Sequence, residues 1–239
     1  MTSDVKLIVS VDPVAYLRAA RDRMEPDPIH YALQAELAGA SGIRAHYRLD
    51  HRFVGEQDLE HLAQLLKTPF YLQVALHQDV VHLVNQLRPA AVMFSSERRE
   101  ELVTANGLDV TLLAGQLKTA IHNIDTKNIK VFLIVDPQFD QIRMAAKLEA
   151  HGLVINVRDL MHEQVTPAGG KRMAHLRDAV RLSSKYGMET HLAGGVSFDR
   201  LPHLAAIPGV SAIHLGHSLA ARSMLLGIDQ AFSRFKANL

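Results

Sequence analysis

The sequence contains no cysteine, which excludes disulfides, thiolate nucleophiles and zinc–thiolate sites. It also lacks tryptophan, and aromatic residues make up only 5% of the chain, so a surface that stacks nucleic-acid bases is not expected. The 26 basic and 25 acidic side chains leave a net charge of +1, which gives no general attraction to nucleic acid or to an anionic membrane. Any anion must therefore be bound by a local arrangement of groups.

Long apolar runs are also missing. No uncharged apolar segment approaches the ~18 residues that span a bilayer, and Met1-Thr2-Ser3-Asp4 does not resemble the start of a secretory signal. We therefore expect a cytoplasmic protein that does not bind nucleic acid or membranes.

What the sequence does contain is a regular series of short apolar runs with the composition of buried strands. They are Val5–Val11, Gly42–Tyr47, Phe70–Ala75, Ala91–Ser95, Ile129–Val135, Leu153–Val157, Met188–Leu192 and Ser211–Leu215. Segments with apolar residues at helical spacing lie between and after them: Pro28–Ala40, Glu56–Leu66, Asp79–Leu87, Val110–Ile124, Gln138–His151, Arg172–Tyr186, Phe198–Ala206 and Ser218–Phe235.

Strict alternation of strands and helices predicts a parallel sheet that is covered on its outer face. Eight such repeats in 239 residues is the size of a (β/α)₈ barrel, so we predict a single TIM-barrel domain over residues 1–239. Two charged segments, Arg18–Pro28 and Glu97–Asn106, interrupt the repeat after the first and fourth strands. Both are expected at the carboxyl ends of the strands, where barrel enzymes build their active sites, and we expect extra helical segments on this face of the barrel.

Polar residues and glycines follow most of the predicted strands. They are Asp12, His46, Arg48, Gln73, Ser95, Ser96, Asp136, Arg158, Asp159, Gly194, Gly195, Gly216 and His217. Alternation along a strand places His46 and Arg48 on the same side. An imidazole can act as a general acid or base, and the guanidinium can hold a phosphate or carboxylate, although a strand histidine can equally be a buried core residue.

Glycines follow the last two strands, at Gly194-Gly195 and Gly216. Barrel enzymes often bind a phosphate at this place with backbone N–H groups and a helix N-terminus, and a glycine lets the backbone approach the phosphate oxygens. These residues therefore predict a phosphate site, the alternative being ordinary turns. His214 and His217 need not converge and have no carboxylate placed with them, so no metal site is expected there. No cofactor is predicted.

Several stretches resemble the pyridoxine 5′-phosphate synthase family over essentially the whole chain. The most distinctive are Glu97-Arg98-Arg99-Glu100-Glu101, Asn106-Gly107-Leu108-Asp109-Val110, His46-Tyr47-Arg48-Leu49-Asp50-His51-Arg52 and Leu215-Gly216-His217-Ser218, and further matches are Val11-Asp12, Leu17-Arg18-Ala19-Ala20-Arg21, Pro26-Asp27-Pro28 and Ala38-Gly39-Ala40-Ser41-Gly42-Ile43.

The resemblance implies condensation of 1-deoxy-D-xylulose 5-phosphate with 3-amino-2-oxopropyl phosphate, giving pyridoxine 5′-phosphate, phosphate and water. It implies a homo-oligomer as well. His46 matches a catalytic histidine of the family, Asp12 and Arg48 match contacts to the pentulose phosphate, and Arg21 matches a contact to the aminoketone phosphate.

The resemblance also assigns Gly195, Gly216 and His217 to the backbone that binds phosphate. Two catalytic positions differ, however. Gln73 stands where the family has its catalytic glutamate, and Gly194 stands where it has a second catalytic histidine. An amide cannot take up a proton at neutral pH, and glycine has no side chain.

Other departures lie around the same site. Ser10 replaces an asparagine, Pro13 and Phe53 each replace a histidine, and Val103 replaces a threonine; Asn156-Val157-Arg158-Asp159 stands where the family has a His-Thr-Gly run. The residues for phosphate binding are thus retained, whereas the reaction centre is changed.

Three hypotheses follow, in order of preference. In the first, the chain is a divergent condensing transferase that acts on a related phosphorylated carbonyl compound with His46 as acid or base. In the second, it is a catalytically impaired paralogue that binds metabolites or serves as a regulatory or scaffold protein. In the third, it is a true synthase with relocated catalytic groups, for which His162, His191 and Asp159 are candidates.

Overall fold

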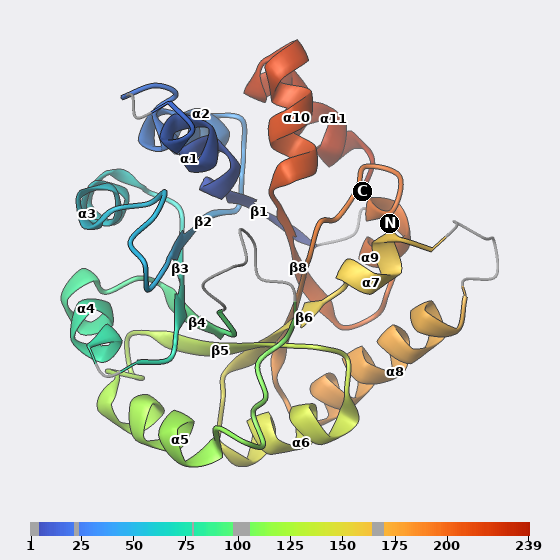
Figure 1. The fold of residues 1–239 in the computed structure, drawn as a ribbon. Coiled ribbons are helices and arrows are strands. Elements are labelled where there is room, and N and C mark those ends of the chain that lie inside the picture. The colour runs from blue at the N-terminus through green and yellow to red at the C-terminus, as the bar shows by residue number, and fades with distance from the viewer. Residues whose placement is uncertain (1–4, 22–23, 78, 98–105, 164–169) are drawn as a thin grey trace.

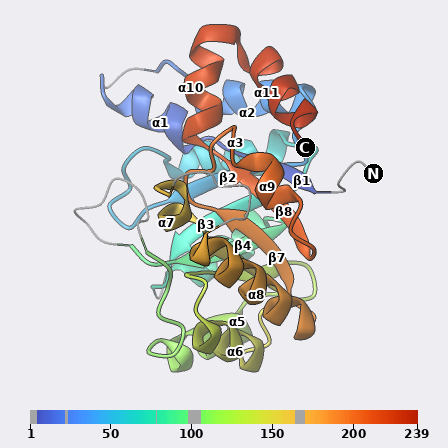
Figure 2. The same ribbon diagram turned by 90° about the vertical axis from the view of Figure 1, so that its right-hand side faces the viewer.

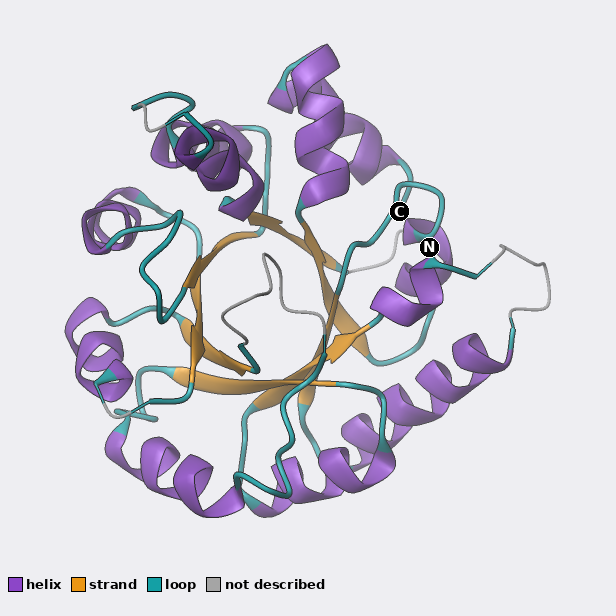
Figure 3. Ribbon diagram, in the orientation of Figure 1, coloured by secondary structure: helices purple, strands orange, loops and turns teal. Residues whose placement is uncertain are grey.

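Eight parallel strands form a closed barrel in the order β1 to β8, which confirms the predicted TIM barrel (Figure 1; Figure 3). The computed structural model describes residues 5–21, 24–77, 79–97, 106–163 and 170–239. The strands are β1 Lys6–Ser10, β2 Gly42–Tyr47, β3 Phe70–Ala75, β4 Ala91–Ser95, β5 Lys130–Val135, β6 Gly152–Asn156, β7 Glu189–Ala193 and β8 Val210–Leu215. All the predicted strands exist, and their ends differ from the predicted ends by a single residue at most.

Helices surround the barrel on its outer face (Figure 3). In the described part of the chain they are α1 Asp12–Ala19, α2 Pro28–Leu37, α3 Glu56–Leu65, α4 Val80–Leu87, α5 Ala114–Asn123, α6 Phe139–Lys147, α7 Arg158–Met161, α8 Lys171–Lys185, α9 Leu201–Ala205, α10 His217–Leu226 and α11 Ile228–Ala237. None of these helices has both the length and the apolar character needed to cross a membrane.

One prediction about helices was wrong, and one helix was not located from the sequence. Extra helical segments were expected at the carboxyl ends of the strands, and α1 is one of them: it follows β1 and begins with Asp12 and Pro13, residues that suit the first turn of a helix. A single helix was expected over Ser218–Phe235, but Gly227 adopts φ 77° and separates α10 from α11. Helices from the two ends of the chain, α1 and α2 with α10 and α11, lie together beside the barrel (Figure 2).

Two apolar layers hold the fold together. The larger layer lies between the strands and the helices, and a smaller one fills the barrel. The inner layer consists of Ile8, Tyr71, Ala91, Met93, Phe132, Ile134, Val154, Ala193 and Ala212. Side chains alternate along a strand, so the residue two positions further toward the carboxyl end also points inward.

Those next inward positions are polar. Ser10 follows Ile8, Gln73 follows Tyr71, and Ser95 follows Met93. The apolar filling of the barrel therefore ends about one layer below its carboxyl-terminal mouth, and the polar side chains above it form the floor of the candidate site.

Candidate active site at the carboxyl ends of the strands

Asp12 holds the ends of β1 and β2 together. Its Oδ1 accepts a hydrogen bond from the backbone N–H of His46 at 2.8 Å, and its Oδ2 accepts one from Ser10 Oγ at 2.6 Å. Arg44 Nη2 lies 3.5 Å from the same Oδ2. Asp12 is 8% exposed, and these internal contacts explain how a charge is tolerated there. Asp12 thus fixes the position of His46 through its backbone.

His46 lies inside the barrel on β2, with only 4% of its surface exposed. Its register partner on β3 is Gln73. Nε2 is buried and has no hydrogen-bond partner among the described residues. Buried polar atoms in proteins nearly always have a partner, so a nitrogen of this kind at the mouth of a barrel is suited to bind a polar atom of a ligand. His46 therefore has the location and the free nitrogen required of a general acid or base.

Arg48 follows β2 and belongs to a cluster of alternating charges. Its guanidinium donates to Asp50 from Nε at 3.2 Å and from Nη2 at 3.1 Å, and Arg52 Nε donates to the same carboxylate at 2.8 Å. Burial opposes ionisation of Asp50, but the hydrogen bonds from Arg48 and Arg52 outweigh it and lower the pKa of Asp50. Burial alone would lower the pKa of Arg48, yet Asp50 and Glu97 raise it, so its guanidinium stays charged.

Gln73 is held by the neighbouring strand. Its Nε2 donates to Ser95 Oγ at 3.1 Å, and this hydroxyl lies 3.4 Å from the carbonyl oxygen of Val74. The side chain is buried, with Gln73 only 3% exposed. Gln73 can therefore orient a polar group beside His46, but it cannot take up a proton at neutral pH.

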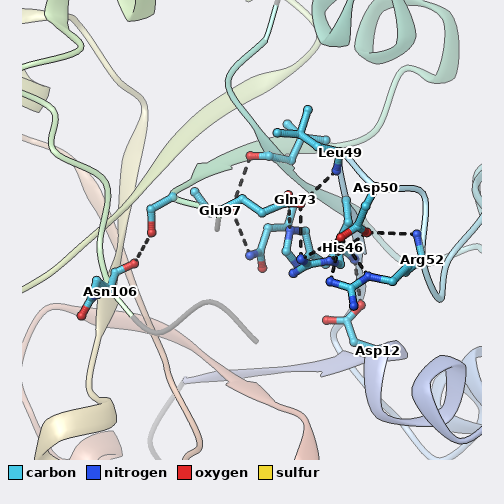
Figure 4. Close-up of polar contacts among 12 residues, drawn as sticks. Asp12, His46, Leu49, Asp50, Arg52, Gln73, Glu97 and Asn106 are labelled. Carbon is cyan, nitrogen blue, oxygen red and sulfur yellow. Dashed lines mark hydrogen bonds and ion pairs between the residues drawn. The ribbon is translucent and has the colours of Figure 1, made fainter. Parts of the chain in front are cut away.

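Glu97 brings a carboxylate to the same place and was not singled out from the sequence. It lies two residues beyond β4, its side chain is 3% exposed, and its Oε2 is 3.6 Å from His46 Nε2. Its Oε1 accepts from the backbone N–H of Leu49 at 3.0 Å and lies 3.5 Å from Arg48 Nη2 (Figure 4). The position of Glu97 just after a predicted strand could have indicated that it belongs to the site. The mixed charges of the residues that follow suggested the start of an exposed helix instead. Arg98 to Glu101 lie outside the described residues.

The other face of the mouth is made of glycines. Gly194 and Gly195 follow β7 with φ of 116° and 75°, and Gly216 joins β8 to α10. Apart from its chain neighbours, no described residue has an atom within 4 Å of where a Cβ on Gly195 would be, and a Cβ on Gly216 would come into ordinary contact with Ser10 and Pro13. The first N–H groups of α10 have no partner within the helix, as at every helix N-terminus, so this face offers backbone donors and open space.

Two of the predicted binding residues, His217 and Arg21, do not belong to the buried group of side chains around His46. His217 is exposed in the first turn of α10, and Arg21 is exposed after α1. Neither is brought into contact with His46 by any interaction among the described residues. Their roles toward phosphate stay predictions.

The buried histidines lie deeper than the mouth. His191 Nδ1 is 3.1 Å from His214 Nε2, and His191 Nε2 is 3.1 Å from Glu189 Oε1 at the start of β7. Burial lowers the pKa of both imidazoles, more strongly for His214, which also senses Arg44. Glu189 has its pKa lowered to about 2 by the hydrogen bond from His191 and by Lys130, against the effect of burial.

This placement answers two questions left by the sequence. His191 contacts Glu189 at the amino end of β7 and so does not replace a catalytic group at the mouth. His162 and Asp159 are exposed, in or next to α7. His214 pairs with His191 and not with His217. Within the described ranges, no three His, Cys, Asp or Glu side chains are grouped as metal ligands would be.

Residues 7–239 match the sequence family described as "Pyridoxal phosphate biosynthesis protein PdxJ". The chain belongs to this family. It is 36% identical over 226 residues to the pyridoxine 5′-phosphate synthase of Pelobacter propionicus, with 95% of each chain covered. It is 35% identical over 228 residues to the enzyme of that name from Syntrophotalea carbinolica, again with 95% of each chain covered. The resemblance seen in the sequence is thereby confirmed.

Solved structures show the fold alone. Phosphoribosyl anthranilate isomerase from Thermus thermophilus superposes with a TM-score of 0.60 at 13% identity, covering 98% of both chains. KGPDC from Streptococcus mutans superposes with a TM-score of 0.65 at 15% identity, covering 98% of this chain and 97% of the other.

Gly194, where the resemblance places a second catalytic histidine, has no room for a side chain in this structure. A Cβ there would collide with Asn156 Oδ1 and would lie 2.9 Å from the backbone nitrogen of Arg158. Asn156 is held in place, since its Nδ2 donates to Asp136 Oδ1 at 2.9 Å and its Oδ1 accepts from the Arg158 N–H at 3.1 Å. Asn156 therefore occupies the space that a side chain at Gly194 would need.

Phe53 and Pro13 are two further positions where the resemblance implies a histidine. Phe53 packs edge-on against Tyr16, with 4.1 Å between the ring centroids, and the Arg52 guanidinium lies 5.4 Å from its ring. Pro13 is partly buried in the first turn of α1. Val103 lies outside the described residues.

Proposed function

We propose that the chain is a condensing enzyme of the pyridoxine 5′-phosphate synthase type, which joins a phosphorylated aminoketone to a phosphorylated ketose. The observation that carries this proposal is the buried His46 Nε2, which has no hydrogen-bond partner among the described residues and stands at the mouth of a PdxJ-family barrel. An imidazole fixed in this way can transfer protons at neutral pH.

The surrounding groups fit two anionic substrates. Gly195 and Gly216 leave the backbone at the ends of β7 and β8 accessible, and the N-terminus of α10 supplies a favourable dipole for one phosphate. Arg48 and Arg52 place guanidinium groups on the opposite side of the mouth, where they favour a second anion. We assign Asp12 to positioning of His46, and Arg21 and His217 to substrate phosphates.

A second candidate function rests on Gly194. The family's second catalytic histidine has no counterpart there, and Asn156 occupies the space beside it. A metabolite-binding paralogue without turnover would have the same phosphate-binding glycines and would not need that histidine. The homo-oligomer implied by the family stays a prediction for either function.

Incubation with both family substrates distinguishes the two functions. Purified protein is mixed with 1-deoxy-D-xylulose 5-phosphate and 3-amino-2-oxopropyl phosphate, and pyridoxine 5′-phosphate is sought by mass spectrometry, with the Pelobacter propionicus relative as positive control. We expect product from the wild type and none from the substrates alone. A thermal shift with each substrate but no product would favour the metabolite-binding function, and neither signal would contradict both.

A further inference from the structure

The side chain of Glu97 is buried, although the residue lies in the loop that follows β4. Only 3% of its side chain is exposed, and Oε1 is occupied by the Leu49 N–H and the nearby Arg48 guanidinium. Its second oxygen, Oε2, faces His46 Nε2 at 3.6 Å (Figure 4). The backbone and Arg48 therefore hold Glu97 so that one oxygen remains for another partner.

Both facing atoms, His46 Nε2 and Glu97 Oε2, are buried without a hydrogen bond among the described residues. Their separation of 3.6 Å is too long for a good hydrogen bond between them. A single oxygen or nitrogen of a ligand can nevertheless lie about 2.8 Å from both atoms, which would satisfy each of them.

Gln73 lies beside His46 but cannot supply a carboxylate for proton transfer. It is the register partner of His46, and the family resemblance places a catalytic carboxylate there. Its amide keeps the shape of that side chain but cannot exchange a proton. Glu97 reaches the same histidine from the end of the next strand, β4.

We propose that Glu97 and His46 form the acid–base pair of this site, and that Glu97 is a catalytic residue supplying the carboxylate that Gln73 lacks. The inference rests on the proposed function. When the substrate amine adds to the ketose carbonyl, a C–N bond forms, the carbonyl oxygen takes a proton from Nε2, and Oε2 takes one from the nitrogen.

The pair is then ready for loss of water. Oε2 donates its proton to the hydroxyl as the C–O bond breaks, so that the hydroxyl leaves as water. Oε2 removes the remaining N–H proton as the C=N bond forms. The products are an imine and one water, and this water, lying between the two residues, relays the last proton from Oε2 to Nε2 and restores their starting state.

The first test is Glu97→Gln, which keeps the size of the side chain and removes its basicity. We expect kcat for pyridoxine 5′-phosphate formation to fall by about 10²–10⁴-fold. The thermal shift caused by inorganic phosphate should be unchanged, since the glycines that bind it are untouched. Glu56→Gln is the matched control: Glu56 accepts from Tyr47 Oη at 2.7 Å, away from His46, and the variant should keep wild-type turnover.

Relocation of the carboxylate gives the converse test. Gln73→Glu in the Glu97→Gln background places a carboxylate on the register partner of His46, and we expect at least a roughly tenfold recovery of kcat. Wild-type turnover by Glu97→Gln would overturn the proposal.

A spectroscopic test does not need turnover. In protein labelled with ¹⁵N-histidine, the His46 ring signals are those that disappear in His46→Asn. We expect Glu97→Gln to shift these signals and Glu56→Gln to leave them in place. If the wild type makes no product, the proposed function fails, while this spectrum still tests the pair; unshifted His46 signals in Glu97→Gln would overturn it.

Discussion

The mouth of the barrel has two unlike halves. The acid–base half, at the ends of β2 to β4, consists of buried side chains that face one another: His46, Arg48, Gln73 and Glu97. The glycine half, at the ends of β7 and β8, consists of Gly194, Gly195 and Gly216 and offers backbone groups and space. The first half acts through the functional groups of its side chains, whereas the second half depends on the absence of side chains, which leaves the backbone accessible.

This difference changes what a substitution does. An isosteric change in the acid–base half removes a proton or a charge and preserves packing. An added side chain in the glycine half meets a neighbour or a bound anion. At Gln73 an amide stands where the resemblance implies an acid, whereas beside Gly194 the side chain of Asn156 occupies the space that an added Cβ would need.

The largest effect is expected from His46→Asn. Because Asp12 binds the backbone N–H of His46, the strand end should keep its position. Loss of the imidazole removes the general acid–base group, and kcat should fall by about 10²–10⁴-fold. Steady-state kinetics with a thermal-shift titration of phosphate checks this; wild-type kcat in the variant would remove His46 from the mechanism.

Gly194→His tests whether the family histidine can simply be restored. The positive φ costs about 1–2 kcal/mol for a residue with a Cβ, and the collision with Asn156 adds about 1–3 kcal/mol. Urea denaturation should therefore show a loss of about 2–5 kcal/mol.

Gly187→His is the control for this substitution. Gly187 has φ 74° and no atom within 4 Å of a Cβ, so only the backbone cost should appear. Equal losses in the two variants would show that Asn156 does not close the site. Asn156→Ala in the Gly194→His background should recover part of the difference.

A smaller effect is expected from Gly216→Ala. The new Cβ would be in ordinary contact with Ser10, 3.6 Å away, so the fold should tolerate it. The methyl group would stand where the phosphate approaches the backbone, and we expect KM to rise about tenfold, or about 1.4 kcal/mol, with kcat retained. Gly115→Ala, in a helix with open space around it, is the control; an unchanged KM in Gly216→Ala would place the phosphate elsewhere.

The smallest effect concerns His214, in the interior beneath both halves. Its pKa is lowered by burial, so the folded state keeps it neutral while the unfolded chain takes up a proton below its ordinary value of 6.5. Stability should therefore be fully present above pH 6.5 and should fall as the pH drops below it, by up to about 1.4 kcal/mol per pH unit for this group.

His214→Gln should reduce that slope by the same amount. Urea denaturation between about pH 7 and pH 5 measures it, with His203→Gln at an exposed position as the control. Parallel pH curves for wild type and His214→Gln would show that His214 is not held neutral.

Much of the fold could be predicted from the chain, because buried parallel strands are continuous apolar runs and each is followed by a helical pattern. Helix α1 was missed because its eight residues show too little apolar periodicity, and the break at Gly227 was missed because the pattern continues across it. At the site, alternation placed His46 and Arg48 on one side correctly, since both lie near Glu97.

Glu97 shows where prediction from the sequence stops. The neighbouring residues do not indicate that Glu97 is buried, since charged residues follow it in the sequence. Its contacts are to His46 on β2 and Leu49 just after β2, about fifty positions earlier in the chain. The sequence by itself determined the strands, the barrel, the family and the presence of His46 and the glycines, because each depends on local pattern or on residue identity. The tertiary structure decided that Glu97 faces His46 and that Asn156 fills the space beside Gly194, because barrel closure brings the ends of distant strands together at one mouth.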